Sequence, residues 1–289
     1  MLSAIIGDVV GSRYEAVPLL FLSPQAPLVE RESSFTDDTI CTLAIGQWLL
    51  ENPQSSPGPW LRALSHDHRE RGFGANYLHW VLNPQAADQM SYGNGAAMRV
   101  SPVAFFAEND QEAMALAEQS LHPTHLHPYS VEGAKATVWA IRHAFEHRDP
   151  ERLLEEASRL FSYGDLTQRD PVAERATHTF DVTVHGTVPL ALVLAARGGS
   201  LDGTLRLAIT MGGDSDTLAA IAGPIAEGLY GLDMALAEQA VRKQEFWFDP
   251  RLWGTLLEFY AHPRVVAFHQ QHGRELPPLE SWYSQGPLF

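Results

Sequence analysis

Apolar residues recur at helical spacing along most of this chain, whereas alternating strand patterns are nearly absent. Helices are predicted over residues 40–50, 111–121, 131–147, 151–161, 188–196, 204–210, 218–229, 233–244 and 252–262. Gly223-Pro224 is expected to kink its helix, because proline lacks an amide hydrogen and crowds the preceding turn. The best strand pattern is Thr179–Val184. Turn-rich segments separate helices and not blocks of different composition, so the pattern predicts one all-α domain over residues 1–289.

Composition narrows the class of protein. The chain has 289 residues, of which 45% are hydrophobic, and a net charge of −15, which disfavours nucleic acid or an anionic membrane as the main partner. No apolar run approaches the roughly 20 residues that span a bilayer, and the first residues lack a basic signal-peptide segment. The only cysteine, Cys41, is expected to be a small buried thiol. We expect a cytoplasmic and monomeric protein, because nothing in the sequence indicates an obligate assembly.

Two short acidic segments carry the strongest chemical signal. Thr36-Asp37-Asp38-Thr39 and Asp214-Ser215-Asp216-Thr217 each combine two carboxylates with hydroxyl groups and lead into an apolar helical pattern. Four carboxylates in one cleft are costly unless cations neutralise them, and oxygen ligands suit hard divalent ions such as Mg²⁺. Helix capping is the alternative for each segment. The sequence therefore indicates a metal-dependent hydrolase.

The second segment is the less easily explained by capping. Gly212-Gly213 precedes it, and paired glycines allow a tight turn close to a ligand. Asp214 and Asp216 lie two positions apart, which suits a turn around an ion better than one helix face. Apolar neighbours indicate that the loop is partly buried, where aspartates need partners. A coincidental pair of caps is the remaining alternative.

Three other stretches offer groups for a ligand. The small residues of Ser91-Tyr92-Gly93-Asn94-Gly95 lead into a helix that contains Met98 and Arg99, and their amides suit a diphosphate, although a plain Asn-Gly turn also fits. His122, His125 and His127 lie in a proline-flanked loop; zinc binding is one interpretation, and a hydrogen bond to a ribose or phosphate is the other. Glu15 follows a glycine-containing segment and is either a residue that closes over a site or a surface glutamate.

Together these segments resemble the ADP-ribosylglycohydrolase family, which includes the ADP-ribosyl-acceptor hydrolases and the dinitrogenase reductase-activating glycohydrolase. The resemblance runs from Met1 to about Gly231 and is carried by Gly7-Asp8, Tyr14-Glu15, Phe35–Thr39, Tyr92–Pro102, Thr124–Pro128, Phe180–Thr183 and Gly212–Thr217. The joint occurrence of these motifs in this order is specific to the family.

The resemblance implies an all-helical fold around a binuclear Mg²⁺ site, or Mn²⁺ in some members. By position it implies that the metal ligands are Thr36, Asp37, Asp38, Asp214, Asp216 and Thr217. It implies that the substrate-binding residues are Ser91, Tyr92, Gly93, Asn94, Gly95, Met98, Arg99 and His125. Glu15 is similar to a mobile catalytic glutamate of the family. Arg13-Tyr14-Glu15 resembles the branch that acts on serine-linked or O-acetyl ADP-ribose, and not the arginine-linked substrate.

The expected reaction is hydrolysis at the anomeric carbon of a terminal ribose, with ADP-ribose or an ADP-ribosylated acceptor as partner. Two metal ions are expected to bind the ribose hydroxyls and activate water. Glu15 is the first candidate for acid–base work and Asp38 the second, because an oxocarbenium-like transition state needs carboxyl groups around it. The alternatives are a non-catalytic ADP-ribose-binding protein of the same fold and a two-metal nucleotide phosphohydrolase.

Overall fold

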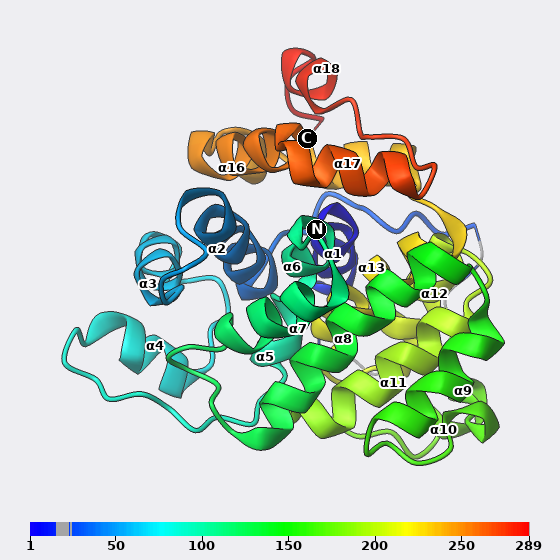
Figure 1. The fold of residues 1–289 in the computed structure, drawn as a ribbon. Coiled ribbons are helices and arrows are strands. Elements are labelled where there is room, and N and C mark those ends of the chain that lie inside the picture. The colour runs from blue at the N-terminus through cyan, green and yellow to red at the C-terminus, as the bar shows by residue number, and fades with distance from the viewer. Residues whose placement is uncertain (16–22, 24, 289) are drawn as a thin grey trace.

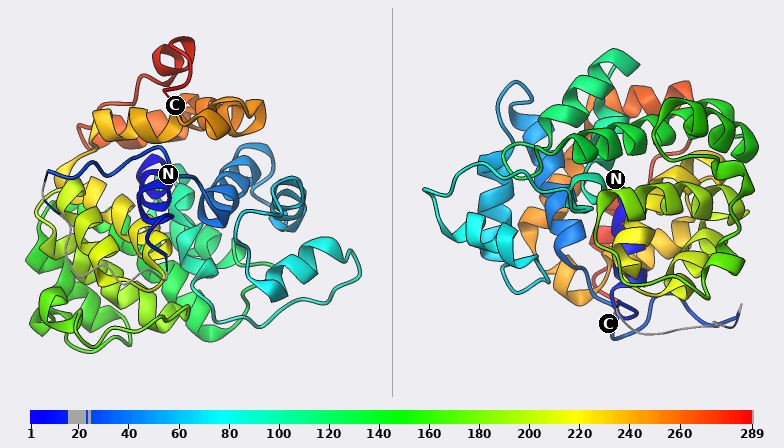
Figure 2. Two further views of the ribbon diagram at one scale, coloured as in Figure 1. Left: turned by 180° about the vertical axis from the view of Figure 1, so that it is seen from behind. Right: turned by 90° about the horizontal axis from the view of Figure 1, so that it is seen from below.

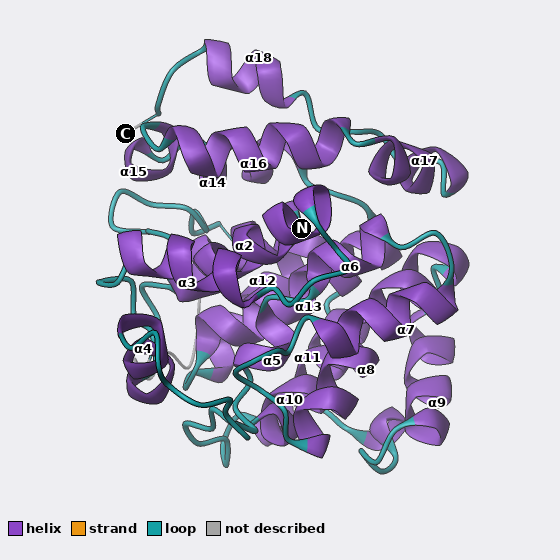
Figure 3. Ribbon diagram, turned by 60° about the vertical axis from the view of Figure 1, so that its left-hand side comes forward, coloured by secondary structure: helices purple, strands orange, loops and turns teal. Residues whose placement is uncertain are grey.

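The computed structural model describes residues 1–15, 23 and 25–288. Regular structure in this part of the chain is helical, and Figure 3 shows helices and loops without a strand. The α-helices are α1 (Leu2–Gly11), α2 (Asp37–Glu51), α3 (Gly58–Asp67), α4 (Ala75–Leu82), α5 (Gly95–Met98), α6 (Ser101–Phe106), α7 (Asp110–Gln119), α8 (Pro128–His147), α9 (Pro150–Leu160), α10 (Pro171–Glu174), α11 (Val184–Arg197), α12 (Leu201–Met211), α13 (Ser215–Tyr230), α14 (Met234–Val241), α15 (Gln244–Trp247), α16 (Pro250–Ala261), α17 (Pro263–Gln271) and α18 (Leu279–Ser284). The all-α prediction is confirmed.

Local residue choices explain where these helices begin and end. Helix α9 starts at Asp149, whose carboxylate accepts hydrogen bonds from the amides of Glu151 and Arg152, with Pro150 in the first turn. The preceding helix, α8, ends at His147 and is followed by Arg148, which has a left-handed backbone with φ of 54°. The connection between α8 and α9 is therefore short and fixed.

Three sequence-based predictions are compared with the structure at the level of single elements. The helix predicted over 233–244 ends at Val241, because Arg242 and Lys243 turn away to donate hydrogen bonds to carbonyl groups of other segments. Residues 179–184 form no strand, and only Thr183 forms an isolated bridge, with Gly93. Helix α13 continues through Pro224, and the kink predicted there stays a prediction.

The innermost pair of helices positions the site. All ten residues of α1 are buried, and α1 lies at the centre of the molecule against α13 (Figure 1). A side chain at Gly7 would overlap the carbonyl group of Ala219, and one at Gly11 would overlap the backbone of Asp216. These two glycines, one helical turn apart, therefore allow the backbones of α1 and α13 to touch.

The remaining helices surround this pair. Helices α2, α3 and α4 lie on one side and α8 to α12 on the other, while α16, α17 and α18 cover one end, as both the front and rear views show (Figures 1 and 2). Among the described residues, no helix combines the length and apolar character that crossing a membrane requires. The starts of α2 and α13 and the loop before α5 are left to line a central cavity.

Candidate active site

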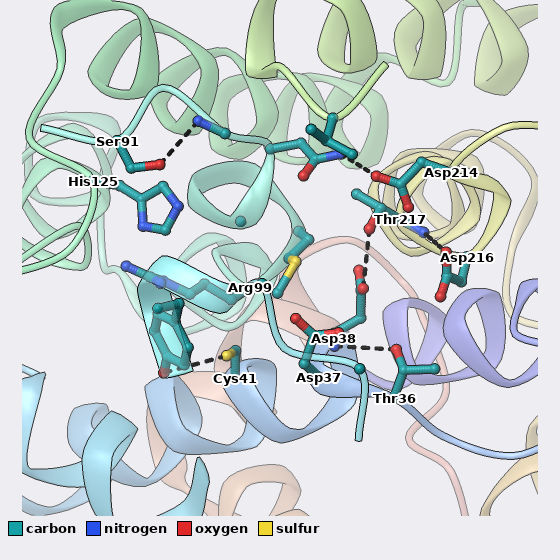
Figure 4. A pocket seen from close by; sticks show the side chains of 18 of the residues that line it. Thr36, Asp37, Asp38, Cys41, Ser91, Arg99, His125, Asp214, Asp216 and Thr217 are labelled. Carbon is teal, nitrogen blue, oxygen red and sulfur yellow. Dashed lines mark hydrogen bonds between the residues drawn. The ribbon is translucent and has the colours of Figure 1, made fainter. Parts of the chain in front are cut away.

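The two acidic segments meet at one cavity of about 480 Å³, where α2 and α13 begin (Figure 4). All six predicted metal-ligand residues line it: Thr36, Asp37, Asp38, Asp214, Asp216 and Thr217. Thr36 does cap α2, since its hydroxyl accepts a hydrogen bond from the amide of Asp38. Asp214 precedes α13, but its side chain makes no capping hydrogen bond. Capping therefore explains only part of the first segment and does not explain why the two segments converge.

Burial raises the pKa of these carboxyl groups, because water no longer solvates their charges. Asp38 is 2% exposed and Asp216 is 4% exposed, and repulsion between the aspartates adds to the effect of burial on the pKa of both. Burial, followed by the charges of Asp8 and Asp214, raises the pKa of Asp37 to about 8. A cluster of this kind requires a cation to hold its carboxylates in the ionised form.

Asp8 belongs to this site, although sequence reasoning assigned it no role. It lies within α1 and is fully buried, and burial raises its pKa. Its carboxylate accepts hydrogen bonds from the amide and the hydroxyl of Thr36 and of Thr39, at 2.5–3.0 Å. The signal that would have found it is a single carboxylate in the otherwise apolar run LSAIIGDVVG, since buried aspartates are rare unless paired.

The carboxylates form two adjoining groups. Oxygen atoms of Asp8, Asp38 and Asp216 lie within 4.8 Å of one another, and so do those of Glu15, Asp214 and Asp216. Asp38 Oδ1 is buried and accepts no hydrogen bond from a described residue, so it is an acceptor that needs a partner. An oxygen-only set of this kind fits Mg²⁺ or Mn²⁺, and the shared Asp216 suits two neighbouring ions.

Glu15 lies at the edge of the cavity, next to the second group. The residues before it are fixed: the ring of Tyr14 is buried, and Arg13 forms an ion pair with Glu30. The Glu15 side chain itself is exposed. Partial burial of its carboxyl group, together with the nearby aspartates, raises its pKa. Glu15 therefore lies beside Asp214 and Asp216 at the rim of the cavity, whereas Asp37 lines the cavity outside both groups.

The predicted diphosphate loop adjoins the predicted metal-ligand residues. Asn94 donates hydrogen bonds from Nδ2 to Asp214 Oδ2 at 2.6 Å and to Thr187 Oγ1 at 3.2 Å. Its amide donates to the carbonyl group of Val182 at 2.8 Å, which fixes the loop. A side chain at Gly95 would come within 2.9 Å of His125 Nε2, so glycine is needed here for the close approach. The loop is thus connected to the acidic end of the cavity.

His125 faces the cavity with its hydrogen bonding already set. Arg99 Nη2 donates to Thr124 Oγ1 at 3.1 Å, and that hydroxyl lies 2.9 Å from His125 Nδ1. Because Thr124 accepts from Arg99, its own hydrogen is available to Nδ1, and we adopt the tautomer consistent with this arrangement, with the imidazole hydrogen on Nε2. Burial and the charge of Arg99 hold the pKa of His125 well below its usual value. His125 therefore presents a neutral N–H donor to the cavity.

The other predicted substrate residues fall into three groups. Ser91, Met98 and Arg99 line the cavity, but the side chain of Arg99 is fully buried. Tyr92 is 54% exposed and lies outside the lining, with its ring against His127. The zinc interpretation of the histidine loop gains no support, since no described group of three potential ligands includes these histidines.

These features define what the site is able to do. Its acidic end suits divalent cations and the positive charge of an oxocarbenium-like centre, while the amide of Gly95 and the ring of His125 offer N–H donors to an anionic or hydroxylated ligand. No lysine lines the cavity in the part of the chain that the structure describes. A ligand that carries phosphate would therefore be held by metal ions and N–H groups.

Comparison with known proteins agrees with this chemistry. The family model of the ADP-ribosylglycohydrolases matches residues 1–262, which extends beyond Gly231, where the recognised motifs end. Human ADP-ribosylhydrolase ARH3 is 26% identical over 341 aligned positions, covering 91% of this chain and 89% of the relative. The ADP-ribosyl-[dinitrogen reductase] glycohydrolase of Rhodospirillum rubrum is 27% identical, covering 70% of this chain and 71% of that protein.

A solved structure supports the fold. A chain described as an ADP-ribosylglycohydrolase-related protein complex matches with a TM-score of 0.62 and 22% identity. The match covers 94% of this chain and 97% of the other. At this identity the likeness concerns the arrangement of helices, so the function rests on the family match and on the cavity.

Proposed function

The chain belongs to the ADP-ribosylglycohydrolase family, and on that premise we propose that it releases ADP-ribose from a modified acceptor by hydrolysis at the anomeric carbon. Its named relatives are hydrolases of glycosyl bonds, and so is this protein. The observation that carries the proposal is the convergence of two carboxylate groups, joined by Asp216, in a cavity that also holds the glycine loop and His125.

The chain's own residues divide the work between the two ends of the cavity. The amide of Gly95 and the Nε2 hydrogen of His125 bind phosphate or ribose oxygens, and their hydrogen bonds orient the ribose toward the aspartates. Two Mg²⁺ ions, or Mn²⁺ in their place, held by the six predicted ligand residues, would supply Lewis acidity and an activated water. The aspartates stabilise the positive charge that develops on the ribose as the bond to the acceptor breaks.

Proton transfer is assigned first to Glu15 and second to Asp38. The water oxygen forms the new bond to the anomeric carbon as the bond to the acceptor breaks; one water proton is transferred to the departing acceptor atom, and the other stays on the new hydroxyl group of the ribose. Glu15→Gln is expected to lower turnover by roughly 10²–10⁴-fold with ADP-ribose affinity retained. Glu155→Gln, on the exposed face of α9, serves as the matched control. Full turnover in the Glu15 variant would remove that residue from the mechanism.

We further propose a serine-linked or O-acetyl substrate over an arginine-linked one. This preference rests on the Arg13-Tyr14-Glu15 sequence, with Glu15 exposed at the cavity. The test is release of ADP-ribose from matched serine-linked and arginine-linked peptides, with Mg²⁺ and with EDTA. Faster metal-dependent release from the serine-linked peptide supports the preference, and the reverse order contradicts it.

The same assay addresses the two alternatives. Intact ADP-ribose as the product supports glycosidic cleavage, whereas AMP or free phosphate would indicate a two-metal nucleotide phosphohydrolase. Binding of ADP-ribose without any product would indicate a non-catalytic binding protein. The presence of all four predicted metal carboxylates in the cavity argues against that last outcome.

A further inference from the structure

Asp8 has an unusual set of contacts for a core residue. It lies in the middle of α1 and is 0% exposed. Asp8 Oδ2 accepts hydrogen bonds from the amide of Thr36 and from both the amide and the hydroxyl of Thr39, and Oδ1 accepts one from the hydroxyl of Thr36. All four donors belong to the first turn of α2, which carries the first group of predicted metal ligands.

The same helix fixes the second group of ligands by direct backbone contact. Gly11, one turn after Gly7, packs against the backbone of Asp216 so closely that no side chain fits between them. The oxygen atoms of Asp8 lie within 4.8 Å of those of Asp38 and Asp216. Helix α1 therefore touches both ligand groups at once, through a carboxylate on one side and a glycine on the other.

We propose that Asp8 is a positioning residue that sets the spacing of the two metal-ligand groups by anchoring the start of α2 to α1. The proposal rests on the metal site of the proposed function, and it concerns the binding of metal before any substrate is present. Both oxygens of Asp8 already accept hydrogen bonds from Thr36 and Thr39, so we place Asp8 beside the metal ligands and not among them. The competing explanation is that Asp8 only caps α2, or only adds negative charge near the ions. These roles make different predictions for residues that contact Asp8.

Thr39→Val separates positioning from charge. Valine keeps the shape of threonine and removes one of the four hydrogen bonds, of 2.5 Å, while the charge of Asp8 is unchanged. Thr42→Val is the matched control, because Thr42 is buried one turn later on α2 and its hydroxyl donates to the carbonyl group of Met98 instead. A role in charge alone predicts no effect of either change on metal affinity.

The measurement is the affinity of the ligand-free protein for Mn²⁺ by titration calorimetry, with the spin coupling of the Mn²⁺ pair followed by electron paramagnetic resonance. Asp8→Leu is expected to weaken Mn²⁺ binding by about 10–100-fold, as for other residues that orient metal ligands. Thr39→Val is expected to cause a smaller loss together with altered coupling, and Thr42→Val to cause neither.

Equal Mn²⁺ affinities and equal spectra for the Thr39 and Thr42 variants would overturn the proposal. Should Asp8→Leu fail to fold, the comparison of the two threonine variants still decides the question. Because the readout is metal binding and not turnover, a positive result stands even if the peptide assays show no release of ADP-ribose. Absence of Mn²⁺ binding by the unmodified protein would contradict the metal site itself.

Discussion

Thr217 Oγ1 donates a hydrogen bond of 3.0 Å to Asp38 Oδ2, although the two residues lie 179 positions apart in the chain. The bond connects the first turn of α13 to the first turn of α2 across the cavity. It occupies one oxygen of Asp38 and leaves the other, Oδ1, without a partner among the described residues. The two acidic segments are therefore held together by a direct contact, as well as by any ion that they share.

Removal of this hydroxyl should weaken metal binding. Thr217→Val is expected to lower the affinity for Mg²⁺ and Mn²⁺ by at least about tenfold, because the carboxylate of Asp38 loses the group that orients it. Thr217→Ser keeps the hydroxyl and should retain most of the affinity. Calorimetric titration of both variants provides the check, and equal affinities would show that the hydroxyl has no part in the site.

The contact between α1 and α13 at Gly11 predicts that Gly11→Ala destabilises the protein, although replacement of a glycine in a helix by alanine usually stabilises it. Gly11→Ala forces a methyl group into the backbone of Asp216 and should destabilise the protein by about 1–3 kcal/mol, with weaker metal binding. Gly254, in α16, has open space where a Cβ would lie. Gly254→Ala should instead stabilise the protein by about 0.5–1 kcal/mol. Chemical denaturation of both variants tests the pair, and similar effects would contradict the close contact.

The hydrogen-bond relay to His125 predicts a fixed neutral ring. Since burial and Arg99 hold its pKa well below the usual value, His125 should not become protonated as the pH falls from about 8 to about 6. Thr124→Val removes the hydroxyl that assigns the hydrogen to Nε2, and should weaken ADP-ribose binding by about 3–10-fold. Nitrogen-15 chemical shifts of the imidazole report the tautomer directly. Titration of His125 near about pH 6.5 would refute this assignment.

The aspartate cluster predicts a pH dependence with a definite sign in the metal-free protein. The pKa of Asp37 is raised to about 8, so the folded state holds more protons than the unfolded state between about pH 4 and pH 8. Stability should therefore fall as the pH rises through about 8. Thermal unfolding in EDTA at about pH 7 and about pH 9 should differ by a few degrees, with the higher Tm at the lower pH.

Two controls complete this experiment. Asp37→Asn should remove much of the difference between the two pH values, because it removes the group that titrates. A saturating concentration of Mg²⁺ should also reduce it, since metal binding favours the carboxylate and competes with the proton. A metal-free protein with the higher Tm at the higher pH would show that other groups control stability in this range.

Sequence patterns were sufficient to predict helices in which apolar residues recur at a clear helical spacing. The helix predicted over 40–50 lies within α2, and the two acidic segments meet as the chemistry of four carboxylates requires. Asp8 was missed because its donors are Thr36 and Thr39, about thirty positions further along, and no local pattern joins them.

The sequence also could not predict which residues of a loop face the cavity. Ser91 and Gly93 line the cavity, whereas Tyr92 between them points outward, because neighbouring residues in an extended stretch face opposite ways. Arg99 lines the cavity but is fully buried and donates a hydrogen bond to Thr124, so its predicted contact with phosphate stays a prediction. In both cases the direction of the side chain depends on contacts between distant segments.

The buried aspartates are the predicted metal ligands, but their mutual repulsion lowers the stability of the metal-free protein. Replacement of one of these carboxylates by an uncharged residue of similar size removes repulsion from the metal-free protein and should make it more resistant to heat. A library screened for thermostability in the presence of a chelator would therefore enrich variants that no longer hold metal. Engineering of this enzyme for robustness requires that every round of selection include the metal ion and a test of turnover.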